Sequence, residues 1–206
     1  MPPAIPARFS IENIRLDGGR PCLDFVNTIH DRFAPIPEDY LATPPQYLEW
    51  CLRVQLLSRH EADRITAAGS VLAEVRAFRE HLHALLSARI DGTTAPAGAL
   101  RECDRWLHQA WANLILDPAS PDAVAWVSPA DARLPLKRIA LSALDVLRNA
   151  EPHRLKRCAS PDSCGWLFYD DSKGGQRRWC AMQACGTLQK MRRYRRGESA
   201  RMVRGR

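Results

Sequence analysis

The sequence predicts a mainly α-helical chain, with a multi-helix N-terminal domain over residues 1–151 and a small cysteine-rich module over residues 152–206. Apolar residues recur at helical spacing through most of the first segment, which is typical of helices that bury one face. Four of the seven cysteines lie close together in the second segment, among turn-forming residues. The length of 206 residues suits one sizeable domain and one small appendage.

The first residues carry no targeting or membrane signal. Residues 1–9 lack the apolar core of a signal peptide and are interpreted as a loose leader. No apolar run approaches the ~20 residues of a membrane span. We therefore expect a cytoplasmic protein with reduced thiols and no membrane partner. Residues 9–16 alternate weakly between apolar and polar, which predicts a short strand or an extended arm.

Start signals and periodicity predict the first helices. Pro21 suits a first helical position, and apolar spacing after it gives a buried helix through about His30. Thr43 before a proline begins a second helix. Ser58 and Glu61 stand in capping-box register and begin a third.

The remaining helices of the N-terminal domain follow from longer periodic segments. Residues 70–90 have a continuous apolar stripe and are the expected core helix. Further helices are predicted over residues 97–116 and 134–149, with a candidate edge strand over residues 123–127. We expect the helix over 97–116 to bury five residues: Leu100, Cys103, Leu107, Trp111 and Leu114.

The four clustered cysteines predict a structural zinc site. Five and four residues separate the members of each pair, and fifteen separate the pairs. Four thiolates at about 2.3 Å make a closed tetrahedral zinc site with no open position for chemistry. Disulfides need an oxidising compartment, and the spacing fits neither common ferredoxin pattern. The turn residues around the cysteines speak against four unrelated core thiols. The predicted Zn²⁺ ligands are Cys158, Cys164, Cys180 and Cys185.

The module around these cysteines is predicted as a β-hairpin followed by a helix, a treble-clef-like arrangement. Residues 155–157 and 166–169 are the expected hairpin arms. A helix is predicted over residues 187–196, ended by Gly197. At 100° per residue its apolar and basic residues separate onto two sides. The apolar side holds Leu188, Met191 and Tyr194.

Charge is distributed unevenly along the chain. The net charge is +7 overall, but residues 151–206 carry 14 Lys/Arg against 5 Asp/Glu, which is +9. The first 150 residues hold 16 against 18, which is −2. Such asymmetry indicates a polyanion-binding module on a nearly neutral body. Solvated helix faces usually carry charges of both signs, whereas the helix predicted over residues 187–196 carries only basic ones. The predicted DNA contacts are Arg177, Arg178, Gln189, Lys190, Arg192, Arg193 and Arg196.

Two stretches of the chain resemble the sequences of a known protein family. Residues 157–196, with Cys-Gly-Trp-Leu-Phe-Tyr-Asp-Asp-Ser and later Arg-Arg-Trp-Cys-Ala-Met, resemble the CGNR-type zinc finger of bacterial proteins. Residues 23–28, Leu-Asp-Phe-Val-Asn-Thr, resemble the opening motif of the ABATE domain. The resemblance spans nearly the whole chain and implies a helical N-terminal domain in a stress-induced transcription regulator. It also implies that this domain senses a signal or oligomerises.

Two features depart from the family pattern. The motif that names the finger reads Cys-Gly-Thr-Leu at residues 185–188, so its Asn and Arg are both absent. The first cysteine pair is one residue wider than usual. The expected zinc ligands survive both changes, but a contact made by the family's Asn-Arg does not carry over. Gln189 is the alternative base-reading residue, because Gln pairs with adenine in the major groove.

The sequence therefore favours a non-enzymatic, zinc-dependent, DNA-binding transcription regulator, with a homodimer and a small-molecule effector as open partners. RNA binding is an alternative, with Trp166, Tyr169, Trp179 and Tyr194 as stacking candidates. A ligand-binding or enzymatic body is another, because Asp24, Asn27 and His30 lie three apart on the first predicted helix. No phosphate-binding loop, nucleophile elbow or zinc-protease motif occurs. We expect residues 1–151 to fold without the module.

Overall fold

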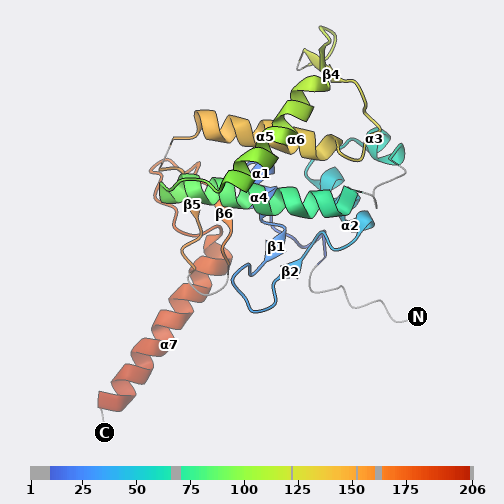
Figure 1. The fold of residues 1–206 in the computed structure, drawn as a ribbon. Helices are drawn as coiled ribbons and strands as arrows, with labels where there is room; N and C mark the ends of the chain where they lie inside the picture. Colours follow the sequence, from blue (N-terminus) through green and yellow to red (C-terminus); the bar gives the residue numbers. More distant parts are fainter. Residues whose placement is uncertain (1–9, 66–70, 122, 152, 161–163, 205–206) are drawn as a thin grey trace, which may run out of the picture.

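Seven α-helices and three two-stranded antiparallel sheets form the described part of the chain, which confirms the mainly α prediction. The computed structural model describes residues 10–65, 71–121, 123–151, 153–160 and 164–204 (Figure 1). The helices are α1 (Pro21–Val26), α2 (Pro44–Arg53), α3 (Arg59–Asp63), α4 (Leu72–Asp91), α5 (Ala97–Ala112), α6 (Leu134–Asn149) and α7 (Thr187–Arg204). The paired strands are β1 (Ile29–His30) with β2 (Glu38–Asp39), β3 (Leu114–Leu116) with β4 (Val124–Trp126), and β5 (Leu155–Arg157) with β6 (Leu167–Tyr169).

The predicted helix starts are confirmed at α2 and α3. Thr43 caps α2 and Ser58 caps α3, each in a complete capping box with the residue three positions later. These side chains satisfy backbone N–H groups that a helix start leaves unpaired. At the other end of a helix, Gly92 follows α4 with φ +64°, a left-handed conformation that glycine adopts without strain.

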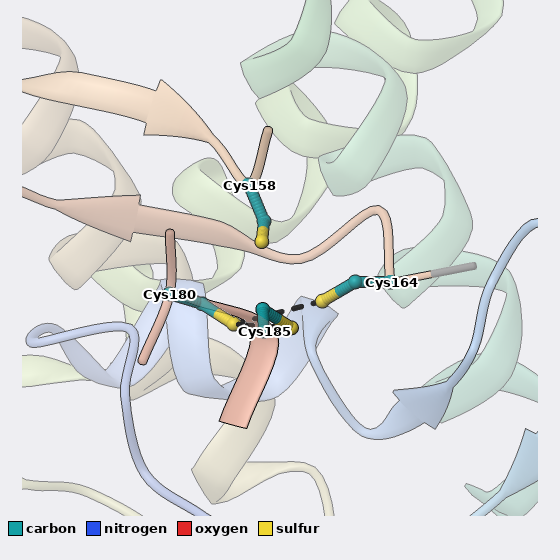
Figure 2. Close-up of side chains that lie close together, drawn as sticks. All are labelled: Cys158, Cys164, Cys180 and Cys185. Carbon is teal, nitrogen blue, oxygen red and sulfur yellow. Dashed lines mark hydrogen bonds between the residues drawn. The ribbon is translucent and has the colours of Figure 1, made fainter. Parts of the chain in front are cut away.

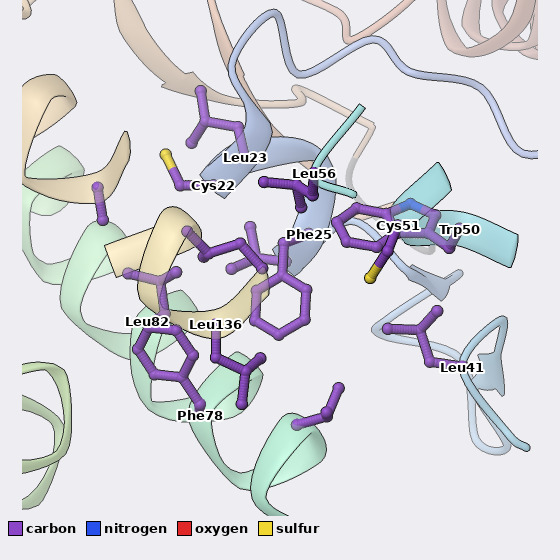
Figure 3. Packing of buried hydrophobic residues seen from close by; sticks show 14 of the residues in the cluster. Cys22, Leu23, Phe25, Leu41, Trp50, Cys51, Leu56, Phe78, Leu82 and Leu136 are labelled. Carbon is purple, nitrogen blue, oxygen red and sulfur yellow. The ribbon is translucent and has the colours of Figure 1, made fainter. Parts of the chain in front are cut away.

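The core of the body lies where α4, α1, α5 and α6 meet (Figure 3). Phe25 of α1 has its ring centroid 5.7 Å from that of Trp50 and 5.8 Å from that of Phe78. Phe78 in turn lies 5.5 Å from Trp106 of α5. These four rings are fully buried, and offset aromatic contacts of this kind add to the gain from area burial alone.

The first helix is shorter than predicted. It ends at Val26, and the chain then turns so that Ile29 pairs with Asp39 in the β1–β2 ladder. The helix ends there because the side chain of Asn27 is hydrogen-bonded to strand β6, which lies far along the chain. The predicted strand or arm at residues 9–16 is also wrong for the described part: Ser10 to Ile14 form a turn, and Phe9 lies outside the described residues. The predicted start of the core helix at Ser70 lies outside them too.

The predicted buried face of α5 is wrong. Leu100 and Trp111 are 48% and 57% exposed, whereas Ala99, Trp106 and Ala110 are buried. Trp106 is part of the buried core, while Leu100, Cys103 and Leu107 border a pocket between α5, α4 and α6. The helix also stops at Ala112, because Leu114–Leu116 pairs with Val124–Trp126 as a hairpin. The predicted edge strand is thus confirmed and gains a partner.

The cysteine-rich module and the body share one core. Leu155, Leu167 and Phe168 of the hairpin are buried in the same cluster as the helical body. The backbone N–H of Tyr169 also donates to the carbonyl of Gly18 at 2.9 Å. The body and the hairpin therefore bury apolar side chains in one common cluster, and the independent folding of residues 1–151 stays a prediction.

Candidate metal centre

The four cysteines stand on two turns that the hairpin brings together. Cys158 follows β5, and its N–H donates to the carbonyl of Trp166 at 2.8 Å, which closes the first turn. Gly165 in that turn has φ +65°, and a Cβ there would lie 2.9 Å from the Phe33 ring, so a larger residue does not fit. Cys180 precedes a π-helical turn over Met182–Gly186, Cys185 lies within this turn, and the turn leads directly into α7.

The sulfur atoms converge on one point (Figure 2). All four lie within 4.8 Å of one another, and all four residues are buried. Two of the separations, Cys164 to Cys180 and Cys180 to Cys185, are 3.6 Å. A tetrahedral zinc site with Zn–S bonds of about 2.3 Å has sulfur atoms about 3.8 Å apart. The cluster therefore fits Zn²⁺, and none of these cysteines forms a disulfide.

The electrostatics of the cluster also call for a cation. Hydrogen bonds from the thiols of Cys164, Cys180 and Cys185 hold the pKa of Cys158 far below its usual range. The same crowding raises the pKa of Cys164. Adjacent thiolates repel one another when nothing neutralises them. A bound Zn²⁺ resolves this, because it holds all four sulfurs in the thiolate form.

Two arginines surround the sulfur cluster. Arg15 of the body donates from Nη2 to Cys180 Sγ at 3.8 Å. Arg177 lies over the Phe168 ring, 4.5 Å from its centroid, and donates to the carbonyls of Trp179, Cys180 and Asp17. The prediction that Arg177 contacts DNA phosphates is thus not matched by its placement, because Nε and Nη2 of its guanidinium donate to backbone carbonyls of the finger and the body.

Asp170 organises the turn between the two cysteine pairs. This buried carboxylate accepts from Lys156 Nζ and from the N–H of Arg177, both at 2.7 Å, and from Ser172. Burial alone would raise its pKa, but these hydrogen bonds lower it well below the ordinary range. Asp170 was not among the residues predicted to form the metal centre. The signal for more was the Asp followed two residues later by Ser, a pattern that favours a side-chain-closed turn.

The predicted ligand cluster of the body is not assembled. Asp24 accepts from the N–H of Gly18 at 2.9 Å, and Asn27 is paired with the backbone of Leu167. His30 lies on strand β1 and borders a different cavity from Asp24. The three side chains therefore do not share a helix face. Asn27 instead joins body to finger, because its amide donates to the Leu167 carbonyl at 2.8 Å and accepts from its N–H at 2.9 Å.

The residues predicted to contact DNA are divided by the structure. Lys190, Arg193 and Arg178 are exposed, and Arg192 is half-buried. Gln189 is only 9% exposed and donates to Ser160 Oγ at 3.1 Å. Its prediction as a base reader is therefore corrected: it fastens the root of α7 to the first cysteine turn. The side chain of Arg196 lies outside the described part.

Other features of the last helix also differ from the prediction. The helix runs through Gly197 to Arg204, so Gly197 does not end it. Leu188, Met191 and Tyr194, expected to face inward, are all exposed. Beyond its first turns, α7 extends away from the finger and the body (Figure 1).

The stacking surface proposed for RNA is mostly covered. Trp166 is 3% exposed, and its Nε1 donates to the Ile29 carbonyl at 2.7 Å. Arg20 lies over the Tyr169 ring and Arg178 over the Trp179 ring. Among the four candidates only Tyr194, 64% exposed, is an open aromatic side chain.

A closed four-cysteine centre at the root of a basic helix, carried on a helical body, defines a zinc-finger protein. Residues 19–150 match the ABATE family, described as "Putative stress-induced transcription regulator", and residues 154–197 match the CGNR zinc finger. The chain belongs to the ABATE family and carries a CGNR-type zinc finger with zinc as its cofactor. A search of curated proteins found no match to the chain.

These matches make the chain a zinc-binding regulator by family, and the two families are regulatory rather than enzymatic. None of the helices in the described part of the chain is long and apolar enough to cross a membrane.

Proposed function

We propose that this protein is a zinc-dependent transcription regulator that binds double-stranded DNA through α7, with Cys158, Cys164, Cys180 and Cys185 as the zinc ligands. The observation that carries the proposal is the projecting basic helix. Its 18 residues correspond to a length of about 27 Å. The helix extends from the finger away from the body (Figure 1), so a duplex can approach it from several sides.

The charge of α7 supports a polyanionic partner. Seven of its residues are basic and only Glu198 is acidic. Lys190, Arg193 and Arg195 are exposed near the finger, where zinc fixes the direction of the helix. Lys and Arg side chains release counterions from phosphates, which supplies most of non-specific binding. The basic residues of the helix are Lys190, Arg192, Arg193, Arg195, Arg196, Arg201 and Arg204.

The shape of the interface favours DNA over RNA. The major groove of B-DNA admits an α-helix, whereas that of A-form RNA is too deep and narrow for side chains to read. Single-stranded RNA is usually held by exposed aromatic side chains, and three of the four candidates are covered. With Gln189 facing inward and the family's Asn-Arg absent, binding rests on phosphate contacts, and we expect weak sequence discrimination.

The body is proposed to sense a signal or to oligomerise. A cavity of about 530 Å³ lies where the body meets the root of α7, and its lining includes Tyr40, Trp166, Leu188 and Arg192. This size falls within the range of small-molecule sites. A ligand held there would contact both the body and the DNA-binding helix. Filling the cavity with Leu188→Trp should abolish any ligand-induced rise in melting temperature found by screening metabolite-like compounds against the wild-type protein.

The DNA-binding proposal is tested by a salt series. Fluorescence anisotropy with a labelled 20-base-pair duplex should give a falling affinity with rising salt. Combined replacement of Lys190, Arg193 and Arg195 by Ala should make the slope of log affinity against log salt shallower by about 2.7, at about 0.9 per phosphate contact. The matched control replaces Arg89, Arg101 and Arg148, three exposed arginines of the body, and changes net charge equally. Equal slopes for the two triple variants would show that α7 does not contact the DNA.

A further inference from the structure

A body residue makes direct contact with the sulfur cluster. Arg15 lies just before α1, and its Nη2 donates to Cys180 Sγ at 3.8 Å, although 165 residues separate the two in sequence. This contact is unusual for a small finger, because the donor comes from outside the finger. It places one positive charge of the body at the edge of the metal centre.

The orientation of Arg15 is fixed on two other sides. Its Nε forms an ion pair with Asp17 at 3.0 Å, and its guanidinium carbon lies 5.4 Å from the centroid of the Trp166 ring. Trp166 is itself held by its hydrogen bond to Ile29. A planar guanidinium can serve a carboxylate, an aromatic face and a sulfur atom at once, whereas an ammonium group cannot.

Charge explains why such a contact matters. Four thiolates around Zn²⁺ leave a net charge of −2 in a buried place, and burying charge without compensation is costly. A cation that donates to a thiolate favours the ionised sulfur over the thiol.

We propose that Arg15 is a positioning residue of the zinc centre: it donates to the sulfur of Cys180 and orients this ligand, so that the body contributes directly to zinc retention. The inference rests on the proposed ligand set and is independent of DNA binding. It assigns to the body a role in the metal site that the finger sequence alone does not contain. Groups that orient or stabilise metal ligands typically change metal affinity by 10–100-fold when removed.

Arg20 provides a matched control. It also reaches from the body to the finger, with hydrogen bonds to Asp171 at 3.0 and 3.1 Å and a cation–π contact to Tyr169. Neither contact involves a sulfur atom. Loss of Arg20 thus weakens docking between body and finger and leaves the thiolates untouched.

The first experiment measures zinc retention in the full chain against a chromophoric chelator. Arg15→Met should bind zinc 10–100-fold more weakly than wild type, Arg15→Lys should lie between them, and Arg20→Met should stay within about threefold of wild type. Wild-type zinc affinity in Arg15→Met would overturn the proposal. So would an equal loss in Arg20→Met, because docking alone would then explain the effect.

The second experiment follows alkylation of the zinc-loaded protein by iodoacetamide, with mass spectrometry to locate the modified cysteines. Cys180 should react several-fold faster in Arg15→Met, since its thiolate loses a hydrogen bond, and at the wild-type rate in Arg20→Met. Circular dichroism confirms that each variant is folded. If Arg15→Met does not fold, the comparison of Arg15→Lys with Arg20→Met decides the question. Equal reactivity of Cys180 in all folded variants would contradict the proposed contact.

Discussion

The role of Asp24 is better explained by its surroundings in the fold than by its spacing from Asn27 and His30 in the sequence. It is buried within α1, and its carboxylate accepts a hydrogen bond from the N–H of Gly18 at 2.9 Å. Gly18 is suited to this place because a Cβ there would lie 2.8 Å from both the N atom of Asp24 and the Cβ of Leu23. Burial raises the pKa of Asp24 to about 6, and the Gly18 bond opposes this only in part.

The raised pKa of Asp24 predicts how the stability of the fold depends on pH. The unfolded chain ionises Asp24 near pH 4, whereas the native state resists ionisation up to about pH 6. Its contribution to stability is therefore present below about pH 4 and is lost as the pH rises through 6. Asp24→Asn keeps an oxygen for the Gly18 N–H and cannot ionise. We expect it to gain stability relative to wild type between pH 4 and 7, by an amount on the order of 3 kcal/mol.

The measurement is urea unfolding of both proteins across this pH range. The difference between them isolates Asp24, because both carry the same zinc centre and respond to acid alike elsewhere. Parallel stability curves for wild type and Asp24→Asn would show that the carboxylate ionises at its ordinary pKa.

At the scale of the element, features fixed by residues close in sequence were predicted better than features that depend on tertiary contacts. The caps of α2 and α3, the hairpin arms and the cysteine turns were predictable because the residues that form them lie within a few positions of one another. The end of α1, the exposed face of α5 and the inward side chain of Gln189 were not. Each depends on a partner elsewhere in the fold, such as Leu167 for Asn27 and Ser160 for Gln189. The same holds at the metal site, where the four cysteines were predictable and Arg15 was not.

A substitution at Gly197 distinguishes a helix that continues to Arg204 from one that ends at Gly197, because it should change helix stability in opposite directions in the two cases. Within a helix, Gly197→Ala should raise helix stability by about 0.5–1 kcal/mol, because glycine loses more conformational freedom than alanine. If Gly197 ended the helix in a left-handed conformation, the same change would introduce strain. Circular dichroism of zinc-loaded wild type and Gly197→Ala at several temperatures separates the two, with a rise in helix content expected. A fall in helix content would support the shorter helix that ends at Gly197.

At the scale of the whole molecule, the finger and the body stabilise each other. The hairpin contributes Trp166, Leu167 and Phe168 to the shared core, and Asn27 and Arg15 reach across from the body. We therefore expect the free energy of zinc binding to stabilise the body as well as the finger.

Cys180→Ser tests this coupling. It should release zinc and raise amide hydrogen exchange both in the finger and in α4 of the body, which contacts strand β5. Cys103→Ser is the control, since Cys103 lies on α5 outside the metal centre and should keep its zinc. Unchanged exchange in α4 of zinc-free Cys180→Ser would show that the body is stable without the finger.

The hydrogen bonds between Asn27 and Leu167 also impose an order on synthesis. Their partners are 140 residues apart, and domains tend to fold as they leave the ribosome, N-terminal parts first. Here the segment around Asn27 emerges early but meets its partners only when nearly the whole chain has been made. Contacts of such long range are slow to form. The body therefore cannot form this contact until strand β6 has been synthesised, and we expect zinc binding, which holds the hairpin in place, to speed its formation.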